Sequence, residues 1–169
     1  IGSGIIGIIG YRFIHVLNRI GTWVLGAGIV LGFGYIFTHV QTTDFLTRGE
    51  FNISGWLATV SLAALWQIAF APYVSDYSRY LPADVPVAST FWTTYLGSAL
   101  GSSLSFIFGA VAVLATPVGM DTMDAVKLAT GAIGPLMLVL FLLSVISHNA
   151  LNLYGAVLSI ITLVQTFAY

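Results

Sequence analysis

The residues best suited to chemistry lie near the C-terminal end of the chain, where polar side chains recur at helical spacing. Placed at about 100° per residue, they fall within one arc of roughly 140°, and they are Ser144, Ser147, His148, Asn152, Gly155, Ser159 and Thr162. The opposite arc is aliphatic and comprises Val139, Leu142, Leu143, Ile146, Leu153, Val157 and Ile160. An imidazole can bind and release a proton near neutral pH, and a carboxamide both donates and accepts hydrogen bonds. The polar face could therefore bind a polar ring and relay a proton. The alternative is a set of interhelical hydrogen bonds.

A second group of candidate residues surrounds Pro72. Gln67 offers both donors and an acceptor, which suits a heterocycle with an amide-like edge, and the neighbouring Trp66 could stack on a flat ring. Proline removes a backbone donor and clashes with the preceding turn. We therefore predict that the helix holding Pro72 is interrupted near Ile68–Tyr73. The alternatives are an ordinary proline kink, helix–helix hydrogen bonding by Gln67 and lipid-facing packing of Trp66.

The composition predicts the helices that carry these residues. The chain has 169 residues, of which 58% are hydrophobic and only 7% charged, whereas soluble domains carry about 25% charged residues. Long charge-free stretches separate the charges, and a membrane-spanning helix needs about 20 mostly apolar residues. We predict an all-α membrane protein with a partial helix over residues 1–14 and four spans over residues 18–39, 54–80, 86–115 and 132–166. The absence of cysteine excludes disulfides and thiolate metal sites, and no basic patch suits nucleic acid.

The loops between the predicted spans carry unequal positive charge. One side of the membrane would hold Arg12, Arg19 and Arg79, and the other would hold Arg48 and Lys127. Lys and Arg near span ends favour the cytoplasmic side, so we expect the first set to be cytoplasmic.

Two shorter segments carry further expectations. Asp76 and Arg79 are three residues apart and could form a structural or gating ion pair at the cytoplasmic mouth. The segment Asp121–Thr130 is predicted to be a short helix at the outer surface, with a solvated loop as the alternative. Gly28 and Gly32 have the spacing that lets membrane helices approach closely, which indicates helix packing.

Three stretches of the chain together resemble the nucleobase:cation symporter-1 family, which includes the purine–cytosine permeases and their allantoin and hydantoin relatives. These stretches are Gly10–Ile20, Ala71–Pro82 and Ser147–Tyr154. The resemblance implies a LeuT-type inverted-repeat transporter of twelve helices, of which this chain would hold the end of helix 4 to helix 8. It begins with Ile and ends in an apolar run, so we expect a fragment that lacks helices 1–3 and 9–12.

The resemblance also implies roles for individual residues. Trp66 or Gln67 would contact the substrate from helix 6, and Asn149 and Asn152 would bind the base from helix 8. The family's sodium-site hydroxyls on helix 8 match Ser147 and His148, with Ser144 one turn earlier. Because a histidine replaces one hydroxyl, the resemblance favours H⁺ over Na⁺ as the coupling ion.

The function expected from these features is import of a nucleobase or related heterocycle by cation or proton symport with alternating access. The protein would lie in the cell membrane as a multi-pass protein, and its ligands would be a small nucleobase-like substrate and H⁺ or Na⁺, without a cofactor. A channel or a non-transporting receptor of the same fold remains an alternative. An intramembrane enzyme is disfavoured, because His15, His39 and His148 lie on separate segments and no carboxylate lies near mid-span.

Overall fold

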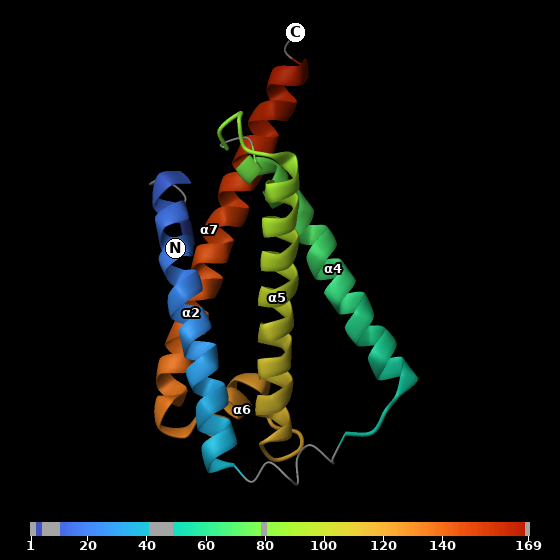
Figure 1. Cartoon of the computed structure of the whole chain (residues 1–169), viewed down its shortest axis with the longest axis vertical. Coiled ribbons are helices and arrows are strands. Elements are labelled where there is room, and N and C mark those ends of the chain that lie inside the picture. Colours follow the sequence, from blue (N-terminus) through green and yellow to red (C-terminus); the bar gives the residue numbers. More distant parts are fainter. Residues whose placement is uncertain (1–2, 5–10, 41–48, 79–80, 168–169) are drawn as a thin grey trace. The chain divides into compact units, whose positions relative to one another are not determined.

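The computed structural model describes residues 3–4, 11–40, 49–78 and 81–167, and within these ranges it contains helices and no strand (Figure 1). The helices are α2 (Tyr11–His39), α4 (Ile53–Ser78), α5 (Val87–Leu114), α6 (Thr122–Ala129), the 3₁₀ turn η1 (Gly131–Ile133) and α7 (Gly134–Phe167). Four of them, α2, α4, α5 and α7, are long and apolar enough to cross a membrane. The predicted all-α membrane class is confirmed.

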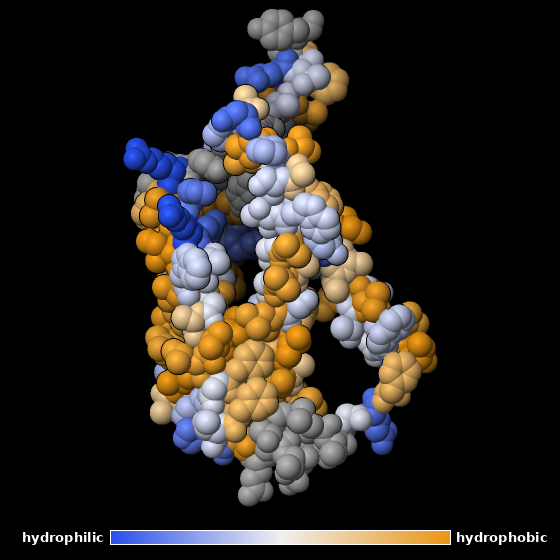
Figure 2. All heavy atoms as spheres, in the orientation of Figure 1, coloured by the Kyte–Doolittle hydropathy of each residue, from blue (hydrophilic) through white to orange (hydrophobic). Residues whose placement is uncertain are grey.

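The chain forms two compact units. The first comprises Ile1–Thr42 and Val111–Tyr169, and the second comprises Thr43–Ala110. The first unit therefore contains α2, α6 and α7, and the second contains α4 and most of α5. Figure 2 shows hydrophilic residues gathered at the N-terminal end of α2 and hydrophobic residues further along it. That distribution suits a helix whose charged end lies at a membrane surface.

The structure corrects the first predicted boundary. The partial helix over 1–14 and the span over 18–39 were expected to be separate, but α2 runs unbroken from Tyr11 to His39. The stretch from Tyr11 to Ile20 contains no glycine or proline, so its Arg and Asn residues mark a polar helix end and do not stop the helix. Residues 5–10 of the expected partial helix lie outside the described residues. The helices α5 and α7 begin and end close to the predicted spans 86–115 and 132–166.

The predicted interruption at Pro72 is wrong for this structure. The helix α4 continues as α-helix from Ile53 to Ser78 with Pro72 inside it. A proline removes a single hydrogen bond, here the one that the Ile68 carbonyl would accept, and the bonds on either side keep the helical path. The helix α4 is therefore continuous but lacks one backbone hydrogen bond at Pro72.

The first unit is built on the antiparallel packing of α2 against α7, which lie side by side in Figure 1. Gly28 and Gly32 of α2 are buried, and a Cβ added to Gly28 would come within 2.7 Å of Leu140 Cδ1. The predicted packing role of Gly28 is confirmed, because Leu140 lies where a side chain at Gly28 would begin.

A compact junction joins α6 to α7. Asp121 caps α6 by accepting a hydrogen bond from the Met123 amide at 2.9 Å, which confirms that the segment after Gly119 is helical. Gly131 has a positive φ of 49° and lies against the ring of Tyr35. A side chain at Gly134 would overlap the Lys127 carbonyl of α6. These glycines therefore set the direction in which α7 leaves α6.

This junction yields a stability prediction. Gly134→Ala should lower the thermal unfolding midpoint in detergent, because its methyl group would displace the α6 backbone, at a cost of about 1–3 kcal/mol. The matched control is Gly21→Ala on α2, which has nothing within 4 Å of an added Cβ. That variant should be neutral or stabilising, since Ala favours a helix over Gly by about 1 kcal/mol. Equal midpoints for the two variants would contradict the tight junction.

Candidate functional site

The polar face of α7 is the part of the first unit with the most side chains that could bind a polar ligand. Its central residues are half-buried and comprise Ser144, Ser147, His148, Asn152 and Gly155. On the opposite side the exposed aliphatic residues are Val139, Leu142, Leu143, Leu153, Val157 and Ile160. The distribution agrees with the predicted division into a protein-facing and a lipid-facing side. Asn149, at the edge of the polar arc, is exposed.

A hydrogen bond fastens this face to α2. The Ser147 hydroxyl donates to Asn18 Oδ1 at 2.6 Å, between residues 129 positions apart in the chain, and both residues are half-buried. Apolar packing accompanies the bond, because Ile14, one turn before Asn18, and Ala150, on the turn after Ser147, are fully buried. The first unit thus places one predicted coupling residue in a partly dry environment with a defined partner.

Asn18 was missed by the sequence reasoning, which placed it at a boundary between helices. The signal was present in the helical period, because the buried residues of α2 share one face of the helix at about 100° per residue. Those residues are Ile14, Gly28, Ile29, Gly32 and Ile36. Asn18 lies on the same face.

The other predicted coupling and substrate residues of α7 share one side of the helix. Ser144 and His148 are four residues apart, as are His148 and Asn152, so the three follow one another along successive turns. The helix therefore brings a hydroxyl, an imidazole and a carboxamide into one row, and Ser147 lies beside it. Hydroxyl and carboxamide oxygens can ligate a hard cation, and the imidazole can carry a proton.

In the second unit, Gln67 is held by two serines of α5. The Ser98 hydroxyl donates to Gln67 Oε1 at 2.7 Å, and Gln67 Nε2 donates to the Ser102 hydroxyl at 3.3 Å. Ser102 in turn donates to the Ser98 carbonyl at 2.7 Å. This arrangement is the helix–helix hydrogen bonding that the sequence left open for Gln67. Trp66 is 48% exposed, so much of its indole is accessible in this unit.

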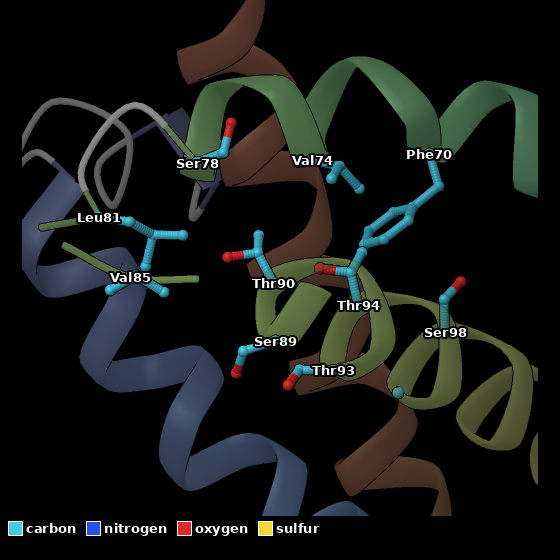
Figure 3. Close-up of a pocket in the computed structure, with 11 residues that line it drawn as sticks. Phe70, Val74, Ser78, Leu81, Val85, Ser89, Thr90, Thr93, Thr94 and Ser98 are labelled. Atoms are coloured by element: carbon cyan, nitrogen blue, oxygen red, sulfur yellow. The ribbon is translucent and has the colours of Figure 1, made fainter. Parts of the chain in front are cut away.

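We call the hydrogen bonds of Gln67 with Ser98 and Ser102 the Gln67 clamp. A pocket of about 430 Å³ adjoins this clamp, between the C-terminal part of α4 and the N-terminal part of α5 (Figure 3). Phe70 and Val74 of α4 line one side, and the α5 side carries the hydroxyls Ser89, Thr90, Thr93, Thr94 and Ser98. The hydroxyl row was also missed, although its three- and four-residue spacing is visible in the sequence. An aromatic wall opposite hydroxyls can accommodate a small molecule with an apolar body and a polar edge.

One predicted feature cannot be placed. The Asp76–Arg79 ion pair lies outside the described residues, because Arg79 and the side chain of Asp76 are not described. Within the ranges that the structure describes, no group of three or more His, Asp or Glu residues could hold a metal ion.

Comparison with known proteins gives one curated relative. The chain is 33% identical over 163 residues to "Putative purine-cytosine permease YxlA" of Bacillus subtilis (strain 168). The aligned region covers 95% of this chain but 35% of that protein, so the chain spans about a third of its relative's length. No family model matches the chain, and no solved structure matches it. Together with the four apolar helices, this relative identifies the chain as a multi-pass protein of the cell membrane.

The Gln67 clamp generates a prediction by double-mutant cycle. Gln67→Leu and Ser98→Ala should each destabilise the purified protein, and their effects should be less than additive because both remove the same hydrogen bond. Interhelical hydrogen bonds in membranes contribute about 0.6 kcal/mol on average. The control is Ser105→Ala, since Ser105 donates to the Gly101 carbonyl of its own helix at 3.0 Å. Additive effects of Gln67→Leu and Ser98→Ala, measured as unfolding free energies, would show that the clamp does not form.

Proposed function

We propose that the chain is part of a secondary active transporter of the nucleobase:cation symporter-1 family. The proposal starts from its similarity to a putative purine–cytosine permease. This similarity supports the family resemblance that the sequence predicted. The proposed activity is import of a nucleobase or related heterocycle, of the cytosine, purine or allantoin class, by symport with H⁺ or Na⁺ and alternating access. Helices 1–3 and 9–12 would be supplied by the rest of the protein.

The observation that carries the proposal is the half-buried polar face of α7. A polar group in the hydrocarbon region is costly unless it is paired, and such residues mark substrate and ion pathways. Here one helix places a hydroxyl, an imidazole and a carboxamide on successive turns and exposes aliphatic residues on its other side. A structural helix needs no such row, whereas a transporter needs a face that binds polar solutes in a dry environment.

The substrate-binding part of the proposal rests mainly on Asn152. Its carboxamide can pair with the donor and acceptor groups at the edge of a base, and its half-buried position leaves part of the side chain accessible. Asn149 and the exposed indole of Trp66 are further proposed contacts. Gln67 is a weaker candidate, because the two serines of α5 already engage both ends of its amide.

The coupling part of the proposal involves Ser144, Ser147 and His148. Two hydroxyls suit a hard cation such as sodium, whereas an imidazole is a poor ligand for it and can instead carry a proton. We propose proton coupling through His148, with a sodium site at the two serines as the competing possibility. The Asp76–Arg79 pair would act as an ion pair at the cytoplasmic mouth. A channel or a receptor of the same fold would show no accumulation of solute against its gradient.

Substitution of Asn152 tests the substrate site. Asn152→Ala should weaken nucleobase uptake by the full-length protein at least tenfold, because a buried hydrogen bond of about 1.4 kcal/mol is lost. The readout is a competition assay with radiolabelled nucleobases at matched expression. The control on the same helix is Ser159→Ala, whose exposed hydroxyl donates to the Gly155 carbonyl at 2.9 Å. Normal affinity in Asn152→Ala would remove this residue from the site.

Ion replacement and one substitution test the coupling. Uptake should collapse with a protonophore and persist when choline replaces sodium, because a proton carried by His148 would couple transport to the proton gradient. His148→Gln should keep substrate binding but lose accumulation against a gradient, since glutamine retains hydrogen bonding without titrating. Sodium-dependent uptake, together with normal accumulation in His148→Gln, would establish the sodium site and refute proton coupling.

A further inference from the structure

The hydrogen bond between α2 and α7 determines what Ser147 can offer to a ligand. A serine hydroxyl has one hydrogen to donate and two lone pairs to accept with. In this structure the hydrogen is directed to Asn18 Oδ1 at 2.6 Å. The remaining capacity of Ser147 Oγ is therefore acceptor capacity, which is the property that a cation ligand requires.

The part of α2 that carries Asn18 packs closely against α7. Ile14, one turn earlier on α2, is fully buried, and further along the same helix the Gly28 backbone approaches Leu140 of α7 closely. The two helices are thus in contact both near the hydrogen bond and beyond it. An acceptor fixed on such a support can hold a neighbouring hydroxyl in one orientation, as partners of metal ligands do elsewhere.

We propose that Asn18 is a positioning residue for coupling. Its Oδ1 accepts the hydrogen bond from the Ser147 hydroxyl and so turns the lone pairs of Ser147 Oγ toward the coupling cation, without itself being a ligand of that cation. The inference rests on the proposed function, and within it on the sodium site at the two serines, because it takes Ser147 Oγ to be a ligand of the coupling cation. It goes beyond that function by assigning a role to a residue of α2, a helix that carries none of the proposed coupling or substrate-binding residues.

The test uses the full-length protein in proteoliposomes and measures the cation concentration that gives half-maximal uptake. Both a sodium titration balanced with choline and a pH titration are run, and substrate KM is measured at saturating cation. Asn18→Leu should raise the half-maximal concentration of the coupling cation about tenfold, equivalent to about 1.4 kcal/mol. Substrate KM at saturating cation should stay near that of the unsubstituted protein.

Three further variants separate positioning from simple helix anchoring. Asn18→Asp retains an acceptor for the Ser147 hydroxyl and should keep or strengthen the cation dependence, because its carboxylate also attracts a cation. Ser147→Ala should weaken cation dependence, and Asn18→Leu should add little to it, because the two residues act through one hydrogen bond. Thr38→Val, which removes an exposed hydroxyl bonded to the Gly34 carbonyl of α2, should change none of these values.

The possible outcomes are distinct. An unchanged cation dependence in Asn18→Leu, while the unsubstituted protein is coupled, overturns the role of Asn18 alone. Equal losses in cation dependence, substrate KM and thermal midpoint show helix anchoring and also overturn it. Should Asn18→Leu fail to fold, Asn18→Asp decides the question, because loss of cation dependence in that folded variant is incompatible with an acceptor role. If the unsubstituted protein depends on protons and not on sodium, the sodium site is absent and the inference falls while proton coupling stands. If it depends on neither ion, the proposed symport itself is wrong.

Discussion

The scarcity of water in a bilayer is the constraint from which the rest of the structure follows. Backbone groups that cannot bond to water must bond within their own segment, so each long apolar stretch becomes a helix. Polar side chains face the same requirement. Many hydroxyls return to a carbonyl of their own helix, as Ser105 and Thr162 do. In the part of the chain that the structure describes, no buried side-chain nitrogen or oxygen lacks a partner.

Polar groups that bond across helices are therefore informative. Ser147 reaches Asn18 within the first unit, and Gln67 reaches Ser98 and Ser102 within the second. The two connections differ in their consequences. The amide of Gln67 uses both its donor and acceptor sides, which makes it a structural clamp, whereas the Ser147 hydroxyl keeps acceptor capacity after its bond to Asn18.

Close packing and polarity also work together in the first unit. Gly28 lies closely against Leu140 of α7, and about three turns earlier on α2 Asn18 accepts the Ser147 hydrogen bond. The glycines at the start of α7 then fix the direction of the helix that carries the polar row. Small residues and polar residues thus both hold α2 against the polar face of α7.

The sequence by itself determined the class of the protein, its long apolar helices and the two-sided character of α7. These properties depend on hydropathy and on the helical period, both of which are local and can be counted along the chain. The family resemblance was also visible, because it rests on short stretches of residues. Sequence patterns gave the wrong local structure where the same residue is compatible with two local structures. Pro72 can break a helix or lie within one, and the charges around Arg12 and Arg19 can mark a loop or a polar helix end.

Only the tertiary structure decided which polar residues meet. Asn18 and Ser147 are 129 positions apart, and nothing near either one in the sequence identifies the other. Gln67 offered the same chemistry to a substrate or to a neighbouring helix, and the position of Ser98 and Ser102 selected the neighbouring helix. The physical reason is that a hydrogen bond between helices depends on their register and distance, which packing sets and which no single segment encodes.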